Sequence, residues 1–318
     1  MDVLSDILDM LRVTGSMSGH FVLGAPWALR VPPRASAAVH LVTQGSCVLT
    51  HQNETLILSE GDLVMFPHSL GHSIASTPGL APGDFPAFVE HARNCQKTPG
   101  SAHQYRGGGP GPQTTILCAE FEFVARDHHP LLEALPERVV MRHEEIRISD
   151  ALSTLLRFLV LELSLDQPGA QVAINRLLDV LLVQIIRVFI HRPDTKAEPG
   201  WLNALSDPQI ASAIARLHAD FQHPWTVGGL ARTVGMSRSG FAEHFRNKVG
   251  LPPLSYLRRW RLQRAAYLLH TTRQPVGEIA HQVGYRSEPS FNKAFHKMFG
   301  CAPGQWRRQS QTPTNTGV

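Results

Sequence analysis

An internal repeat in the C-terminal third constrains the fold of this chain more than any other feature. Residues 226–237 match residues 275–287 at an offset of 49, which one inserted residue in the second copy raises to 50. Beyond the match, four residues recur at the larger offset: Phe241 and Phe291, Phe245 and Phe295, Gly250 and Gly300, and Pro253 and Pro303. A repeat that keeps its apolar, glycine and proline positions indicates a duplicated structural unit.

Each copy has the residue pattern of a helix-turn-helix unit. In the first copy Leu230-Ala231 belong to a short helix, and the small alanine allows a second helix to cross closely. Gly235 follows at the turn, where a positive φ costs little only for glycine, and Ser237 stands where the next helix needs a cap. The second copy has the same order of residue types: Ile279-Ala280, Gly284 and Ser287.

The second helix of each copy has an aromatic side and a polar side. The phenylalanines of each copy stand four residues apart and therefore share one face of a helix. The polar face of the first helix contains Arg238, Ser239, Glu243, Arg246 and Asn247, and that of the second contains Glu288, Asn292, Lys293, His296 and Lys297, with Arg286 just before it. Pro289 falls in the first turn, where its missing N–H costs little.

Between the copies, residues 254–269 predict one amphipathic helix of roughly 24 Å. Its predicted apolar side consists of Leu254, Leu257, Trp260, Leu262, Ala265, Leu268 and Leu269. Four arginines lie outside that side or at its edge: Arg258, Arg259, Arg261 and Arg264. A rigid joining helix would fix the two reading helices relative to each other, so we expect them to enter major-groove segments about 34 Å apart.

The charge distribution agrees with a nucleic-acid partner. From Trp225 to the end the chain has 14 lysines and arginines but only three glutamates, a net charge of +11 against +4 for the whole chain. The preceding 224 residues therefore carry −7. A basic domain beside an acidic one is typical of nucleic-acid binders. A protein-binding solenoid of helical hairpins is the alternative, which the repeat, the joining helix and the charge together disfavour.

The second copy and its tail resemble the signature of the AraC/XylS family of bacterial transcription regulators. The matching residues are Pro275, Val276, Glu278, Ile279, Ala280, Val283, Gly284, Tyr285, Ser287, Phe291, Ala294, Phe295, Phe299, Gly300, Pro303, Trp306 and Arg307. The resemblance covers about residues 207–308 and implies double-stranded promoter DNA and RNA polymerase as partners, with activation as the usual outcome. It also implies base contacts by Ser239, Ala242 and Glu243 in the first reading helix and by Glu288, Pro289, Asn292 and Lys293 in the second.

The N-terminal half is expected to be rich in strands and then helical. Short apolar runs between turn residues predict strands at 21–23, 27–31, 39–43, 46–50, 55–58, 63–66 and 116–124. Residues 78–113 concentrate proline and glycine and predict a long loop. Leucines and isoleucines at helical spacing predict an antiparallel helix pair at 149–165, capped by Ser149, and at 172–190, before a polar linker at 192–200. This pair either packs on the β domain or forms a homodimer face.

Residues 61–72 resemble the second cupin motif, with Ser69 in place of its last glycine, and residues 40–45 end like the first motif. The resemblance implies a small β-barrel over about residues 18–125, and only His40 and His72 occupy motif positions of metal ligands. Two imidazoles alone hold a metal weakly, and His20 or Cys118 is the candidate third ligand. We therefore predict an effector site at His40, His72 and Cys118, with a divalent metal as one candidate cofactor and ordinary core histidines as the alternative. Cys118 and Cys47 are candidate redox sensors.

Together these features predict a multidomain α and β protein. Its expected parts are a cupin-like sensor domain at 1–145, a helical pair and linker at 146–200 suited to dimerisation, and an all-α DNA-binding domain with two helix-turn-helix units at 201–318. The expected function is a ligand-, metal- or redox-responsive transcription regulator that is not an enzyme. A metal-dependent cupin enzyme fused to a DNA-binding domain and a constitutive DNA binder with a purely dimerising β domain are the alternatives. We expect a cytoplasmic protein without a membrane partner, because no apolar run reaches about 18 residues.

Overall fold

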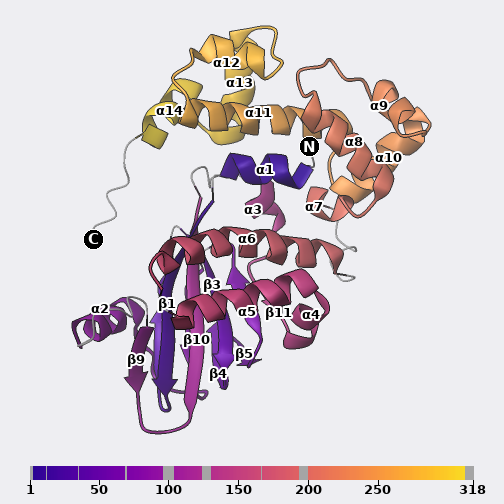
Figure 1. The fold of residues 1–318 in the computed structure, drawn as a ribbon. Helices are drawn as coiled ribbons and strands as arrows, with labels where there is room; N and C mark the ends of the chain where they lie inside the picture. The colour runs from indigo at the N-terminus through magenta and orange to yellow at the C-terminus, as the bar shows by residue number, and fades with distance from the viewer. Residues whose placement is uncertain are drawn as a thin grey trace. The chain divides into compact units, whose positions relative to one another are not determined.

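The computed structural model describes residues 3–11, 13–34, 36–68, 70–95, 104–123, 130–165, 167–192 and 200–311. The chain divides into two compact units (Figure 1). The β unit comprises residues 13–123 and 135–189, and the helical unit comprises residues 1–12, 124–134 and 190–318. Of the linker expected at 192–200, residues 193–199 lie outside the described residues. None of the described helices has the length and apolar character that a membrane span requires.

The β unit is built from two sheets. The first has the strand order β11-β6-β3-β10-β1-β9 and the second the order β5-β4-β7-β2-β8, with mostly antiparallel neighbours. The strands are β1 (Thr14–Gly24), β2 (Ala28–Val31), β3 (Ala37–Gln44), β4 (Ser46–His51), β5 (Glu54–Ser59), β6 (Leu63–Phe66), β7 (His72–Ala75), β8 (Gly83–Asp84), β9 (Gln104–Gly108), β10 (Gln113–Glu122) and β11 (Val139–Met141). The strands expected from the sequence are present, and β7, β8, β9 and β11 are additional.

The two sheets face each other across one apolar core. Phe21 and Ile116 of the first sheet and Leu49 and Ile74 of the second belong to a single cluster of buried side chains. Along β1 buried residues alternate with less buried ones, as expected for a strand with one face on a core. The described strands do not close into a ring, so the expected cupin-like barrel is a sandwich of two facing sheets.

The loop expected at 78–113 is wrong for most of that segment. It contains β8, the helix α2 (Phe85–Cys95) and β9, while residues 96–103 lie outside the described residues. The reason is aromatic packing, because the ring of Phe21 lies 5.2 Å from Phe85, 6.2 Å from Phe88 and 5.0 Å from Tyr105. These contacts order a segment whose prolines and glycines alone predict a loop. Residues 78–82 and 109–112 contain no helix or strand, as expected, and Gly79 and Gly108 have φ values of +81° and +86°.

The expected helix pair is confirmed as α5 (Asp150–Leu165) and α6 (Ala170–His191), preceded by the short α4 (His143–Ile148). The Ser149 hydroxyl accepts a hydrogen bond from the Leu152 N–H at 3.4 Å, in the capping role expected for it. The α6 helix packs closely on β1, where Asp179 accepts a hydrogen bond of 2.8 Å from the Gly15 N–H. A Cβ at Gly15 would lie 2.7 Å from Cβ of Leu178, so this approach needs glycine.

The helical unit contains the two helix-turn-helix units. Its helices are α1 (Val3–Leu11), α3 (Pro130–Ala134), α7 (Trp201–Ala204), α8 (Pro208–Ala219), α9 (Val227–Thr233), α10 (Arg238–Val249), α11 (Pro253–Thr271), α12 (Val276–Gln282), α13 (Glu288–Phe299) and α14 (Pro303–Gln311). The α1 helix packs on α8 and α3 packs on α7, so two segments from the N-terminal half belong to this unit.

Candidate DNA interface and sensor pocket

The first reading helix, α10, has the turn and the cap that the sequence predicts. Gly235 has a φ of +69° in the turn before it. The Ser237 hydroxyl accepts a hydrogen bond of 3.2 Å from the Gly240 N–H. Phe241 and Phe245 are fully buried, and Gly250 ends the helix with a φ of +81°. Because the two phenylalanines fix one side of α10 in the core, its polar side faces outward.

The second reading helix, α13, has the same frame with one difference. Gly284 has a φ of +84° at the turn, and Phe291 and Phe295 are fully buried. Ser287 occupies the cap position, but its side chain forms no cap hydrogen bond. Its hydroxyl lies 2.8 Å from the Ser290 hydroxyl, so the expected side-chain cap at Ser287 is wrong.

Most residues predicted to contact DNA lie on the surface of these helices. Nine of them are exposed: Arg238, Ser239, Glu243 and Arg246 near α10, and Arg286, Glu288, Pro289, Lys293 and Lys297 near α13. Ala242 and Asn292 are half-buried. The exposed set contains five cations against two acids, which suits contact with phosphates and base edges.

The joining helix α11 differs from the expected amphipathic pattern at two positions. Leu254 is 39% exposed, although the sequence predicts it on the buried side. Gln263 is buried, although it is polar. The other predicted apolar positions are buried except Leu268, which is half-buried. A helix contacted by several neighbours buries more than one stripe, which a single-face pattern does not predict.

Two arginines of α11 have structural contacts that the sequence does not indicate. The Arg261 guanidinium donates hydrogen bonds to the carbonyls of Phe221 (2.6 Å) and His223 (2.9 Å) before α9, and of Gly284 (3.4 Å) in the second unit's turn. It therefore ties the segment that leads into the first helix-turn-helix unit to the turn of the second. Arg264 lies over the rings of Phe221 and Tyr267 at 5.6 and 5.9 Å. The Arg264 guanidinium therefore packs on these rings and is not a free cation at the edge of the helix.

Two polar pairs, one buried and one half-buried, also hold the first helix-turn-helix unit together. His218 stacks on Trp260 with ring centroids 3.7 Å apart, and its Nε2 lies 2.8 Å from the Tyr256 hydroxyl. Burial lowers the pKa of His218 to about 3, so the ring is neutral. His244 of α10 lies 2.8 Å from Asp207, the N-cap residue of α8. Nothing in the local sequence pattern joins these residues, because each pair is brought together by helix packing.

In the β unit, His40, His72 and Cys118 come together in the core between the sheets. The Nδ1 atom of His40 lies 3.0 Å from Sγ of Cys118, and its Nε2 lies 2.7 Å from Nε2 of His72. The Nδ1 atom of His72 lies 3.1 Å from the carbonyl oxygen of Leu70. His72 also stacks on Phe66 with centroids 4.1 Å apart. The three predicted effector residues are thus one hydrogen-bonded chain.

The direction of this chain follows from the Leu70 carbonyl. A carbonyl only accepts, so His72 Nδ1 donates to it and His72 Nε2 is left as an acceptor. His40 then donates from Nε2 and accepts at Nδ1 from the Cys118 thiol. The ionisation states agree, because burial lowers the pKa of His40 well below its usual value and that of His72 to about 4. Burial likewise raises the pKa of the Cys118 thiol, so all three groups are neutral.

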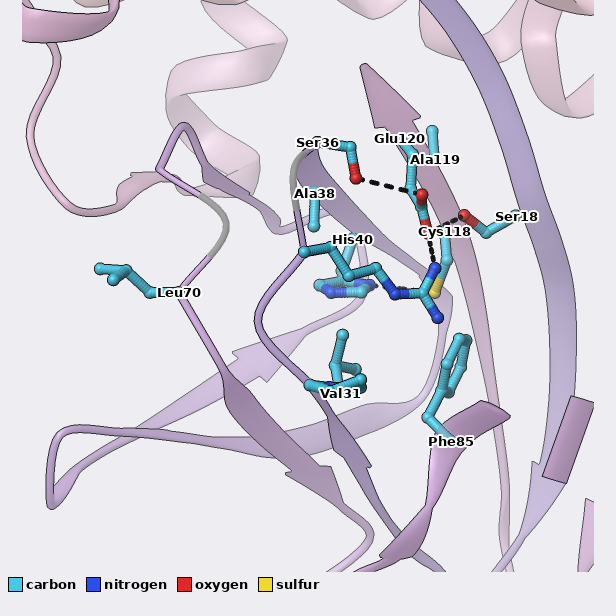
Figure 2. A pocket seen from close by; sticks show the side chains of 12 residues that line it. Ser18, Val31, Ser36, Ala38, His40, Leu70, Phe85, Cys118, Ala119 and Glu120 are labelled. Atoms are coloured by element: carbon cyan, nitrogen blue, oxygen red, sulfur yellow. Dashed lines mark hydrogen bonds and ion pairs between the residues drawn. The ribbon is translucent and has the colours of Figure 1, made fainter. Parts of the chain in front are cut away.

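A cavity of about 20 Å³, room for about one water molecule, opens beside His40 and Cys118 (Figure 2). Glu120 stands on its wall and accepts hydrogen bonds from the hydroxyls of Ser18 and Ser36, both at 3.1 Å. The Arg34 guanidinium forms an ion pair with the same carboxylate. The sequence does not predict Glu120 or Arg34 at this site, because strand register and not sequence spacing places them there.

The cluster does not fit a metal ion as it is arranged. His40 uses one ring nitrogen toward Cys118 and the other toward His72, so the three donors do not converge on one point. In the described part of the chain no group of three or more histidine, cysteine, aspartate or glutamate side chains has the arrangement of a metal site. The other candidate ligand, His20, is half-buried on β1 opposite Leu117, and burial lowers its pKa.

Comparison with known proteins agrees with both halves of this description. Residues 2–191 match a cupin family model, and residues 230–309 match a helix-turn-helix domain model. A putative AraC-like transcription regulator of Streptomyces antibioticus is 32% identical over 97% of this chain and 99% of its own length. The HTH-type transcriptional regulator AlkR of Acinetobacter baylyi is 30% identical over 98% of this chain and 100% of its own. A solved AraC-type DNA-binding domain protein of Chromobacterium violaceum is 30% identical and covers 35% of this chain and 99% of its own, with a TM-score of 0.34.

Proposed function

Since this chain belongs to the AraC family of DNA-binding transcription regulators, we propose that it activates transcription in response to a signal sensed in its cupin domain. The observation that carries this proposal is the buried chain of His40, His72 and Cys118 beside a small cavity. The core between two facing sheets can be built from apolar side chains and does not need buried histidines. Burial of a polar side chain in such a core is less favourable than burial of an apolar one of similar volume, so we attribute a function to this cluster.

The proposed signal is a polar molecule or an oxidant of only a few atoms, because the cavity beside the cluster has room for about one water molecule. The Cys118 thiol donates to His40, so a molecule that takes this hydrogen bond, or a modification of the thiol, would disturb the hydrogen bonds of His40 and then of His72. Because His40 and Cys118 lie on the first sheet and His72 on the second, the change would be felt by both sheets. The absence of converging metal ligands among the described residues disfavours the metal-dependent enzyme as the alternative.

On the DNA side, we propose that α10 and α13 enter the major groove with their exposed polar faces. Lys293 and Asn292 of α13 would provide the strongest base contacts, because amide and ammonium groups match the acceptor and donor edges of adenine and guanine. The first helix offers Ser239 and Glu243, which suit weaker or cytosine-directed contacts. RNA polymerase is the proposed partner once both helices are bound.

We further propose that the chain forms a homodimer through the outer side of α5 and α6. Phe158 (48%), Leu165 (50%) and Val172 (66%) are large apolar side chains that lie exposed on these helices. A patch of this kind on two neighbouring helices is typical of a protein–protein interface. Sedimentation of the full chain should give the mass of a dimer, and Phe158→Glu should give a monomer that is still folded.

A pair of matched cysteine variants tests the sensing site. A reporter gene is placed behind a promoter that binds the full chain, and cells are challenged with a panel of small metabolites and oxidants such as hydrogen peroxide. Cys118→Ala, which removes both the thiol and the hydrogen bond to His40, should abolish the response that the wild type shows. Cys47→Ala, which changes another buried thiol of the same core but lies outside the cluster, should keep it. If both variants respond like the wild type, the sensing proposal is wrong. Binding of each variant to the promoter DNA is measured separately from its response.

A further inference from the structure

A second and much larger cavity lies on the outer side of the first sheet. It is a groove of about 580 Å³ between β3, the turn at Gly61, α4 and α5, and it shares no lining residue with the small cavity beside His40. Its volume is in the range of small-molecule sites, about 300–1,000 Å³. All of its lining residues belong to the β unit.

The floor of this groove is apolar. Leu41, Ile146 and Leu156 are buried beneath it, and Val160 and Leu161 of α5 form one side. Leu161 is 49% exposed although it is a large apolar side chain. Covering such a surface with an apolar group is favourable by about 25 cal/mol for each Å² removed from water. The floor therefore suits a ligand with an apolar body.

The rim of the groove is positively charged. Arg147 of α4 and Arg157 of α5 line it, against the single carboxylate of Glu60. In the described part of the chain neither arginine forms an ion pair with an acidic side chain. A guanidinium binds a carboxylate or sulfonate through two parallel hydrogen bonds. Two such groups above an apolar floor are complementary to an amphipathic anion.

The wall opposite α5 is fixed in place. Gly61 has a φ of +86°, and a Cβ there would lie 2.1 Å from Nδ1 of His143, so the imidazole occupies the space that a side chain would take. Buried Asp62 accepts hydrogen bonds from the N–H groups of His143 (2.9 Å) and Ser59 (3.0 Å) and from Arg142 (2.7 Å). These contacts hold the β5–β6 turn to the start of α4, so this wall is preformed.

We propose that this groove binds an amphipathic organic anion, with an apolar body on the floor and one carboxylate or sulfonate group between Arg147 and Arg157. The site is separate from the cluster of His40, His72 and Cys118 and goes beyond the proposed function. It gives the β unit a second ligand of a different chemical class. Binding to it is measured on the purified full chain without DNA, so its failure leaves the proposed function standing.

Two fluorescent probes that share one ring system test the proposal. 8-Anilinonaphthalene-1-sulfonate carries the anionic group, and N-phenyl-1-naphthylamine lacks it. The sulfonate should bind one site per chain with a Kd of about 1–100 μM, and the neutral probe should bind at least about tenfold more weakly. Arg157→Gln and Arg147→Gln should each weaken the sulfonate about fivefold. Arg176→Gln, an exposed arginine on α6 outside the groove, should leave the Kd unchanged.

A variant that fills the groove separates this site from other apolar surfaces. Ser164 lines the groove and is exposed, so Ser164→Trp should fold normally and abolish stoichiometric binding of the sulfonate. Equal binding of both probes, or unchanged binding by Ser164→Trp, would overturn the proposal. Absence of sulfonate binding by the wild type, together with a shift of Ser164→Trp from dimer to monomer in sedimentation, would also overturn the proposal. The groove would then be a contact between two copies of the chain.

Discussion

Nε2 of His40 lies 2.7 Å from Nε2 of His72, and this contact joins the two sheets of the β unit through their core. One histidine comes from β3 and the other from the start of β7. Both rings are buried and neutral, and the only arrangement of protons that satisfies the Leu70 carbonyl makes His40 the donor. A change at either ring therefore acts on both sheets.

The stability of the β unit should fall as the pH drops from 6.5 toward 4. The pKa of His72 is about 4 in the folded protein against 6.5 in the unfolded chain, so in this window the unfolded state binds the extra proton. This one group should remove about 3 kcal/mol from the free energy of unfolding between those pH values. Urea unfolding monitored across the window measures it, and His72→Gln should show a flatter pH dependence. A His72→Gln curve parallel to that of the wild type would contradict the assigned pKa.

Lys293→Ala should relax sequence preference at one part of the DNA site. Its ammonium is exposed on α13, and loss of one base contact costs about 1–3 kcal/mol. Fluorescence anisotropy on duplexes with single-base changes measures the preference. Arg264→Ala is the contrast, because its guanidinium packs over Phe221 and Tyr267 and should affect unfolding more than base preference. Equal and sequence-independent losses for the two variants would show that α13 does not read bases.

The contacts of Arg261 should make DNA binding sensitive to the spacing of the two half-sites. Its guanidinium donates hydrogen bonds to the carbonyl of Phe221, which precedes the first helix-turn-helix unit, and to the carbonyl of Gly284 in the turn of the second. Inserting about 5 base pairs between the half-sites puts them on opposite faces of the duplex and should sharply weaken wild-type binding. Arg261→Ala should bind the original site more weakly and lose less on insertion, whereas the exposed neighbour Arg258→Ala should keep the wild-type sensitivity. Identical spacing curves for wild type and Arg261→Ala would refute this role.

Local patterns predicted the helical unit well because its fold repeats itself. The turns at Gly235 and Gly284 and the buried phenylalanines are fixed by neighbours within a few residues, which a sequence displays directly. The β unit is different, because strand register decides which side chains meet. Cys118 stands opposite His40 only through the pairing of β10 with β3. The sequence suggested that these residues share a site but could not show the order of their hydrogen bonds.

Tertiary packing accounts for the elements that the sequence did not predict. Phe85 and Phe88 belong to a proline-rich segment, yet their contacts with Phe21 order a helix there. The ion pair of Glu133 on α3 with Arg259 on α11 joins residues 126 positions apart, and no local pattern indicates it. The groove beside Arg157 likewise depends on how α4 and α5 lie against β3. Such features become visible only when distant segments are placed in space.

The most direct test of this account is selection of binding sites from a pool of random DNA duplexes by the full chain. A regulator that reads DNA with both α10 and α13 should enrich a motif of two conserved segments about 10 base pairs apart, and its affinity should fall steeply as salt rises. Substitution of Lys293 should blur one segment and leave the other intact. A protein that is folded by circular dichroism but enriches no sequence, or retains no duplex at low salt, would contradict the central claim.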